Sequence, residues 1–163
     1  MNPTIDLEDL ALRLPAKARL IGLDLGTKTI GLAISDVERR LASPLRTLPR
    51  GAFRKDADAL VAIFTEFEIA GVILGLPLDL EGRDGPRAQS TRAFARNLSM
   101  RTALPIAYWD ERFSTAAVTR SLIANDVSRT RRAEVVDRMA AAYILQGALD
   151  RLARLRPNAG DLS

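Results

Sequence analysis

The sequence predicts an α/β fold in which a mixed, five-stranded sheet is flanked by helices. Two observations predict this class: three strand-like apolar segments come first, and helical and strand-like segments alternate after them. The length also limits the number of domains, because 163 residues, 47% of them hydrophobic, are enough for one domain with a hydrophobic core and too few for two sizeable ones. We therefore expect a single layered domain.

The chain is expected to divide into an N-terminal appendage at residues 1–18, one domain at residues 19–155 and a flexible tail at residues 156–163. The appendage contains a short amphipathic helix, which is expected to end at Pro15. The apolar residues of this helix recur at helical spacing: Leu7, Leu10, Ala11 and Leu14.

Residues 20–36 predict a hairpin of two apolar strands joined by a Gly-Thr-Lys turn. The first strand is apolar on both faces, which is typical of a strand covered on both sides, yet it carries Asp24 directly before the turn. An ionised carboxylate in such a place is costly unless it is paired or holds a metal. The alternative is a structural role, in which Asp24 accepts hydrogen bonds from the turn.

The elements after the hairpin follow from periodicity and from turn residues. A third strand is expected at residues 41–48, where Pro44 favours a bulge or a strand start. Apolar residues at helical spacing predict a helix at residues 53–67, and residues 71–77 predict a short buried strand. The remaining elements are expected in this order: a loop at 78–87, a helix at 88–100, a strand at 105–109, a helix at 114–124, a polar, basic loop at 125–132 and a closing helix at 133–155.

The absence of two residue types limits the chemistry. The chain has no His and no Cys, which excludes disulfides, zinc fingers, His-based metal sites, Ser-His triads and Cys nucleophiles. Acidic residues with a hard cation such as Mg²⁺ are the simplest catalytic set that remains. The net charge of +4 and the pI near 10.1 favour a polyanionic partner, although basic proteins without nucleic-acid targets are common.

No segment of the sequence predicts a membrane protein or an exported one. No apolar run approaches the roughly 18 residues that a membrane span needs. The first 15 residues lack a cationic start followed by an apolar block. We expect a cytoplasmic protein without a membrane partner.

Three acidic residues are expected to meet at one edge of the sheet. Asp24 and the pair Asp110 and Glu111 follow strand ends, where the sites of open α/β sheets gather. Strand alternation places Glu111, rather than Asp110, on the face that carries Trp109. Helical spacing places Asp137 on the apolar face of the closing helix, among small alanines.

Three carboxylates at one place repel one another unless cations neutralise them, which favours a Mg²⁺ site. Each acid also has a simpler interpretation. Asp137 could be a buried acid paired with an arginine such as Arg112, and Asp110 and Glu111 could be a solvated strand end.

Four blocks of the sequence resemble the YqgF/RuvX family of Holliday-junction resolvases, also described as pre-rRNA nucleases. The resemblance runs from about residue 20 to about residue 150, and the order and spacing of the blocks make it specific. The blocks are Gly22 to Lys28 with Gly31, Gly75 to Leu78, Asp110 to Thr115, and Val136 to Ala141 with Ile144 and Leu145.

The resemblance implies an RNase H-like sheet whose first three strands are antiparallel and whose next two are parallel. It also implies that Asp24, Glu111 and Asp137 are the catalytic, metal-binding acids, with Mg²⁺ or Mn²⁺ as the cofactor. RNase H-like nucleases usually have four acids, so the fourth ligand is left to Asp110, to a loop acid such as Asp84 or to a substrate phosphate.

The implied function is a metal-dependent endonuclease acting on phosphodiester bonds of structured nucleic acid. The substrate is either precursor 16S rRNA, processed at its 5′ end in ribosome biogenesis, or a DNA four-way junction, whose resolution would call for a homodimer with two sites. Cations expected on the nucleic acid are Lys28, Arg83, Arg112, Arg131 and Arg132, with Arg87, Arg92 and Arg96 as further candidates.

Two other functions fit parts of the sequence. Residues 24–28 also resemble the first phosphate loop of actin-like ATPases and sugar kinases, but those proteins have two lobes and need far more than 163 residues. A non-catalytic nucleic-acid or ribosome-binding protein with the same fold is the second alternative. The acids argue against it, because carboxylates at the binding surface repel phosphate.

Overall fold

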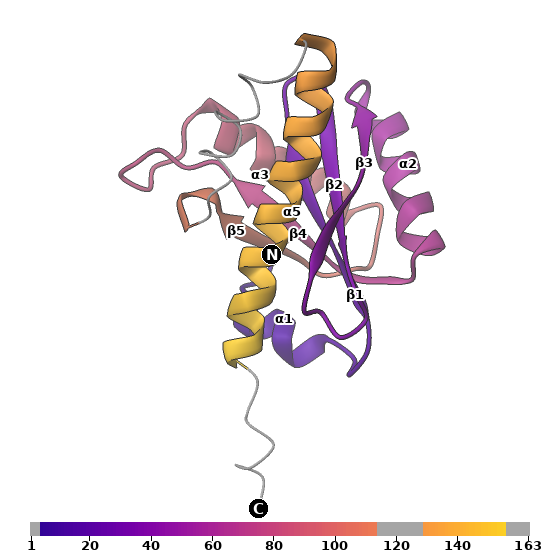
Figure 1. Ribbon diagram of the computed structural model, residues 1–163. Helices are drawn as coiled ribbons and strands as arrows, with labels where there is room; N and C mark the ends of the chain where they lie inside the picture. The colour runs from indigo at the N-terminus through magenta and orange to yellow at the C-terminus, as the bar shows by residue number, and fades with distance from the viewer. Residues whose placement is uncertain (1–3, 114–128, 156–163) are drawn as a thin grey trace, which may run out of the picture.

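The computed structural model describes residues 4–113 and 129–155, with side chains from residue 136 onward in the second range. Its centre is a five-stranded sheet in the order β3-β2-β1-β4-β5 (Figure 1). β2 pairs antiparallel with both β1 and β3, whereas β4 pairs parallel with both β1 and β5. The predicted α/β fold, with three antiparallel strands followed by two parallel ones, is confirmed.

The first three strands form the predicted hairpin and its neighbour. β1 covers Arg19–Leu25 and β2 covers Thr29–Ser35, and the turn between them is closed by a bond from the Gly26 amide to the Thr29 carbonyl, 2.8 Å long. β3 covers Ala42–Pro49. The β2–β3 register shifts between the pairs that contain Arg46 and Pro44, because proline has no amide hydrogen to donate to the ladder.

The alternating half of the chain begins with α2 at Phe53–Glu66, β4 at Ile69–Leu76 and α3 at Pro86–Ser99. α3 starts two residues before the predicted position, because proline is tolerated in the first turn of a helix. β5 follows at Ile106–Asp110 and continues into a 3₁₀ turn, η1, at Glu111–Phe113.

The last described helix, α5, covers Arg129–Leu155 and begins four residues before the predicted start. The prediction of a loop is therefore wrong for residues 129–132. No glycine or proline interrupts that stretch, and arginine is a good helix former. The helix predicted at residues 114–124 lies outside the described residues.

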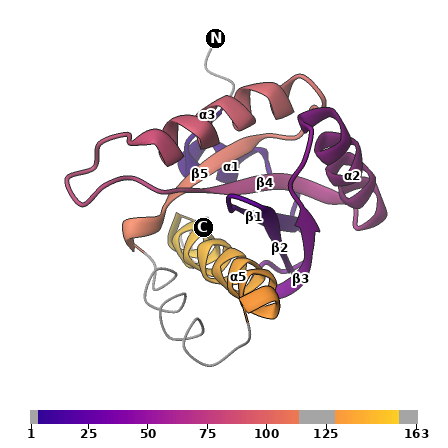
Figure 2. The ribbon, with the colours of Figure 1, turned by 90° about the horizontal axis from the view of Figure 1, so that it is seen from above.

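The sheet is covered on both faces, as Figure 2 shows from above. α2 and α3 pack on one face, against a core that includes Ile21, Leu23 and Leu74. α5 packs on the other face, against Leu20 and Ile73 among others. β1 and β4 are apolar on both faces because each face has its own helical layer.

The segment expected as an appendage, residues 1–18, contains α1 at Leu7–Arg13. Leu10 of this helix has no exposed surface and packs in the core on the α5 face. Ile5 lies beside β5, and its amide donates to the Ile106 carbonyl over 2.9 Å. The described part of the segment therefore extends both the sheet edge and the core. Among the described residues, no helix is long and apolar enough to cross a bilayer.

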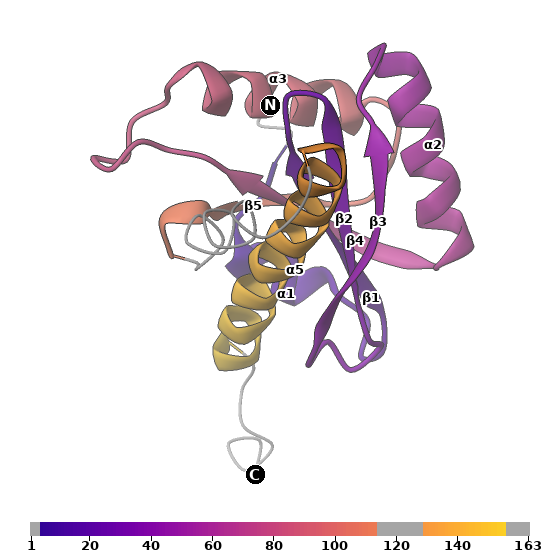
Figure 3. The same ribbon diagram turned by 45° about the horizontal axis from the view of Figure 1, so that its top comes forward.

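α5 approaches the centre of the sheet unusually closely, because glycines lie beneath it. A Cβ atom on Gly22 would lie 2.8 Å from the Cβ of Leu145, and one on Gly31 would overlap the main chain of Asp137. Such distances are too short for ordinary van der Waals contact. Figure 3 shows the result: the start of α5 lies beside the β1–β2 hairpin.

We expect Gly31→Ala to destabilise the protein by about 1–3 kcal/mol, because the added methyl group meets main chain, which cannot rotate away as a side chain can. Denaturant unfolding measures the change. Gly51→Ala is the matched control, since nothing lies within 4 Å of its added Cβ, and it should change stability by less than about 0.5 kcal/mol. Equal effects of the two substitutions would contradict the close approach of α5.

Candidate active site

Asp24 lies near the end of β1 and points to the face that α5 covers. The side chains of Leu20 and Asp24 share this face because strand residues alternate, and Leu20 packs against α5 residues. Only 1% of Asp24 is exposed. The residue is thus a buried carboxylate at the carboxyl end of a central strand.

Both strands beside Asp24 place a glycine next to it. β2 pairs Gly31 with Asp24, and β4 pairs Leu74 with Leu23, which brings Gly75 to the other side of Asp24. Cross-strand neighbours project from the same face of a sheet. The absence of side chains at both glycines leaves space around the Asp24 carboxylate.

The other two predicted acids lie against glycines at the same corner. The Glu111 Oε1 atom lies 2.8 Å from the position that a Cβ on Gly75 would take, and Glu111 is 9% exposed. The Asp137 Oδ2 atom lies 2.8 Å from the corresponding position on Gly26. The fold therefore brings Asp24, Glu111 and Asp137 from three separate elements to one corner of the sheet.

The hydroxyl of Thr29 donates a hydrogen bond to the Asp137 Oδ2 atom. This bond turns the Asp137 carboxylate toward the first residue of β2. Within the described residues, no three acidic side chains are arranged so as to hold a metal ion together. The sequence analysis missed Thr29, because its partner is 108 positions away and no local pattern links the two.

Asp110 is bound to Arg112 and does not join the other acids. The Arg112 Nη2 atom lies 2.6 Å from Asp110 Oδ2, and the Arg112 main-chain amide donates to Asp110 Oδ1 over 3.0 Å. Burial raises the pKa of the Asp110 carboxyl, but the bonds from the Arg112 side chain and amide outweigh burial and hold the pKa below its usual value.

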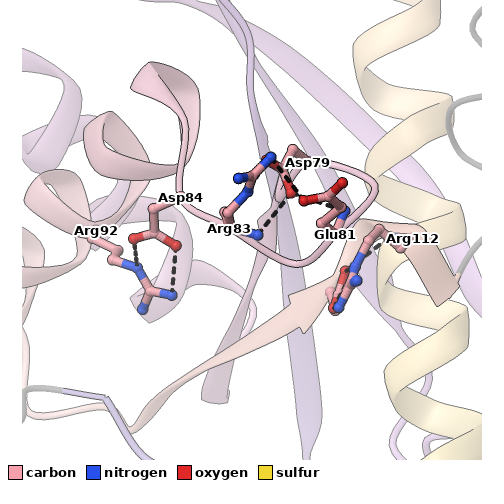
Figure 4. Close-up of polar contacts among 7 residues, drawn as sticks. Asp79, Glu81, Arg83, Asp84, Arg92 and Arg112 are labelled. Atoms are coloured by element: carbon pink, nitrogen blue, oxygen red, sulfur yellow. Dashed lines mark hydrogen bonds and ion pairs between the residues drawn. The ribbon is translucent and has the colours of Figure 1, made fainter.

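Asp84, the other candidate for a fourth ligand, is also held by an arginine. Arg92 binds it in a fork, with Nε 2.6 Å from Oδ2 and Nη2 3.1 Å from Oδ1 (Figure 4). A bidentate pair of this kind fixes both carboxylate oxygens. Neither Asp110 nor Asp84 is thus presented toward Asp24.

The loop between β4 and α3 is ordered by its own charges, as Figure 4 shows. The Asp79 carboxylate accepts hydrogen bonds from the main-chain amides of Glu81 and Arg83, at 2.9 and 2.8 Å. The Arg83 guanidinium forms ion pairs with the carboxylates of Asp79 and Glu81. The Arg112 guanidinium lies against Gly82, whose φ of 83° is a backbone conformation that favours glycine. Arg112 therefore joins this loop to the end of β5.

The cations predicted to contact nucleic acid have different surroundings. Lys28 is exposed in the β1–β2 turn, beside the end of the strand that carries Asp24. Arg83 and Arg112 are already paired with acids, so a phosphate would have to compete for them. Arg131 and Arg132 belong to the first turns of α5, and their side chains lie outside the described ones.

Comparison with known proteins identifies relatives over most of the chain. The profile of the RuvX family, described as "Holliday junction resolvase", matches residues 18–151. A protein of Methylocella silvestris named "Putative pre-16S rRNA nuclease" is 59% identical over 155 residues, covering 95% of this chain and 96% of the relative. A protein of Bradyrhizobium sp. (strain BTAi1) with the same name is 60% identical over 154 residues, covering 94% of this chain and 96% of the relative.

Among solved structures, Thermus thermophilus RuvC has a similar fold. Its TM-score to this chain is 0.53 at 11% sequence identity, and the match covers 83% of this chain and 96% of RuvC. RuvC in complex with a Holliday junction substrate gives a TM-score of 0.52 at the same identity. At this identity the likeness concerns the fold alone, and it agrees with the RNase H-like sheet implied by the sequence.

We expect Arg112→Gln to raise the pKa of Asp110 above its wild-type value, because burial of Asp110 remains while the bonds from the guanidinium are lost. The carboxyl carbon shift of Asp110, followed by NMR during a pH titration, measures this. Arg154→Gln, at the far end of α5, is the control and should leave the titration unchanged.

The same substitution should change how stability depends on pH. The folded-state pKa of Asp110 is below its ordinary value of 3.8, so ionised Asp110 stabilises the fold above that pH and loses this contribution as the pH falls through the folded-state pKa. Arg112→Gln should therefore be less stable than wild type at pH 7, and the difference should shrink toward pH 3. A difference that is independent of pH would contradict this account.

Proposed function

This chain belongs to the RuvX family, and on that premise we propose that it is a nuclease that hydrolyses phosphodiester bonds of structured nucleic acid with Mg²⁺ or Mn²⁺. The observation that carries the proposal is the convergence of Asp24, Glu111 and Asp137 at one corner of the sheet. Asp24 and Glu111 are buried and Asp137 is half-buried. Carboxylates gathered in this way cost free energy, because each loses water and each repels the others. A divalent cation bound among them offsets both costs.

The donors present suit a hard divalent cation. All three acids offer carboxylate oxygens, which Mg²⁺ and Mn²⁺ prefer, and the chain has no His or Cys to favour zinc. Asp24, Glu111 and Asp137 would hold the ion, and Asp137 would exchange its bond with the Thr29 hydroxyl for the ion. When bound, such an ion makes a water molecule more acidic and stabilises negative charge on a phosphate.

The protein's own groups have distinct tasks in this proposal. Gly31 and Gly75 leave room for α5 and Glu111 to lie close to Asp24, and the close packing of α5 excludes bulk water from one side of it. Thr29 orients the Asp137 carboxylate. Lys28, exposed in the turn next to Asp24, is placed to bind a phosphate of the cleaved strand.

The precursor of 16S rRNA is the substrate we favour, because relatives that share 59% and 60% of their residues with this chain carry that function in their names. The acting protein would then be cytoplasmic, where ribosomal RNA is processed in bacteria. A DNA four-way junction is the second candidate and rests on the family description. Its resolution needs two sites related by symmetry, and hence a homodimer, whereas trimming one RNA end does not.

A cleavage assay tests the proposal. We expect the wild type to cleave a labelled precursor of 16S rRNA, and to a lesser extent a labelled four-way junction, only when Mg²⁺ or Mn²⁺ is present. Asp24→Asn and Asp137→Asn should each lower the rate by roughly 100-fold or more, because each removes a charged ligand while keeping the shape of the side chain. Mapping the product ends distinguishes processing at the 5′ end from cleavage elsewhere.

Asp150→Asn is the matched control, since Asp150 is exposed on α5 and, among the described residues, its side chain forms a hydrogen bond only with Gln146. It should cleave like the wild type. Undiminished cleavage by both Asp24→Asn and Asp137→Asn would refute the acidic site. Tight binding of either substrate with no cleavage in Mg²⁺ or Mn²⁺ would instead identify a non-catalytic nucleic-acid-binding protein.

A further inference from the structure

A pocket opens beside the end of β1, on the opposite face of the sheet from Asp24. Its volume is about 200 Å³, and it lies between the β1–β2 turn, the residue after β3 and the first two turns of α3. The residues that line it are Leu25, Gly26, Thr27, Arg50, Pro86, Arg87, Ser90 and Thr91.

The lining of this pocket is suited to an anion. Two arginines and three hydroxyl-bearing residues line it, and none of the described residues that line it is acidic. In the described part of the chain, no carboxylate forms an ion pair with Arg50 or Arg87. Arg92 and Arg112 each pair with one carboxylate, and Arg83 pairs with two. The positive charge of the pocket is therefore not neutralised by the protein groups around it.

Arg50 is held in place before any ligand arrives. Its Nη1 atom donates to the Gly26 carbonyl over 2.7 Å, and its Nη2 atom lies 3.3 Å from the Ser90 hydroxyl oxygen. Its guanidinium also lies over the ring of Phe94, 6.0 Å from the centroid. A guanidinium fixed in this way loses little conformational entropy when it binds an anion.

Arg87 differs, because it is exposed and its side chain forms no hydrogen bond or ion pair with the described residues. It lies in the first turn of α3, where the N-cap Gly85 offers no side chain to the main-chain amides. These amides add a smaller attraction for negative charge, which supports the arginines but would not make a site without them. The pocket thus combines one fixed and one adjustable cation.

The pocket and the acidic corner are separated only by the thickness of the sheet. Asp24 and Leu25 are consecutive residues of β1, with Cα atoms about 3.8 Å apart and side chains on opposite faces. A chain that crosses the end of β1 would pass the acidic corner on one face and the pocket on the other. Both can therefore contact one continuous nucleic-acid strand.

We propose that this pocket binds a backbone phosphate of the nucleic-acid strand, a short distance along the chain from the phosphodiester at Asp24. The proposal rests on the nuclease function proposed above and assigns part of its substrate-binding surface. Arginine forms strong, charge-assisted hydrogen bonds with phosphate, and the hydroxyls of Thr27 and Ser90 can donate to the remaining phosphate oxygens. The Thr91 hydroxyl is already engaged, because it donates to the Arg87 carbonyl over 3.0 Å. Such a contact would set the position of the strand at the acidic corner without reading its sequence.

Binding measurements in an Asp24→Asn background test this, because binding is then followed in Mg²⁺ without cleavage. Adding Arg87→Gln should weaken binding of a labelled precursor RNA about 5- to 10-fold and lower the slope of log Kd against log salt concentration by about 1. Arg13→Gln is the matched control, since Arg13 is exposed on α1 and its substitution removes the same charge at a position outside the pocket. It should alter neither quantity by as much.

A second measurement locates the phosphate. RNA strands are prepared in which one phosphate at a time is replaced by an uncharged methylphosphonate. At one position the replacement should weaken binding by the protein that retains Arg87, and should have little further effect on the Arg87→Gln protein. A double-mutant cycle of this kind isolates one contact.

The outcomes separate the two proposals. If Arg87→Gln binds like Arg13→Gln, or if no methylphosphonate position is coupled to Arg87, the phosphate pocket is refuted while the nuclease proposal stands on cleavage by the wild type. If the wild type neither binds nor cleaves precursor RNA or a junction, the nuclease proposal fails and the pocket proposal fails with it.

Discussion

The close approach of α5 to the sheet is the constraint on which the rest of the structure depends. Gly22 and Gly31 have no side chains that would hold this helix away from the sheet. The helix in turn has small residues, such as Ala140 and Ala141, on its packed face. Van der Waals contact between main chain and main chain needs small residues on both sides. The glycines therefore allow the helix to pack closely, and they also leave room for other groups to lie beside Asp24.

This packing also explains why a carboxylate lies in an otherwise apolar layer. Asp137 follows the same helical face as the buried alanines, so close packing of that face presses it toward the end of β1. Thr29 meets it there with a hydroxyl. Elsewhere at this end of the sheet, Asp110 and Asp84 are each bound by an arginine.

Local pattern accounts for most of the fold and for the choice of candidate acids. Periods of 2 and 3.6 residues located the strands and helices within a few positions, whereas the choice of Glu111 over Asp110 rested on strand alternation together with the family resemblance. The errors lie where no local signal exists. No glycine or proline in the sequence marks the start of α5 at Arg129. The burial of Leu10 depends on α5, a helix more than 100 positions away along the chain.

By itself, the sequence determined the order of strands and helices, the chemistry left open by the lack of His and Cys, and which acids face the packed layer. These properties depend on residue type and short spacing, which physical periodicity converts directly into structure. Only the tertiary structure decided which distant groups meet. The bond between Thr29 and Asp137 and the pocket beside Arg50 join groups whose proximity arises from packing between the sheet and its helices, which spacing along one chain does not encode.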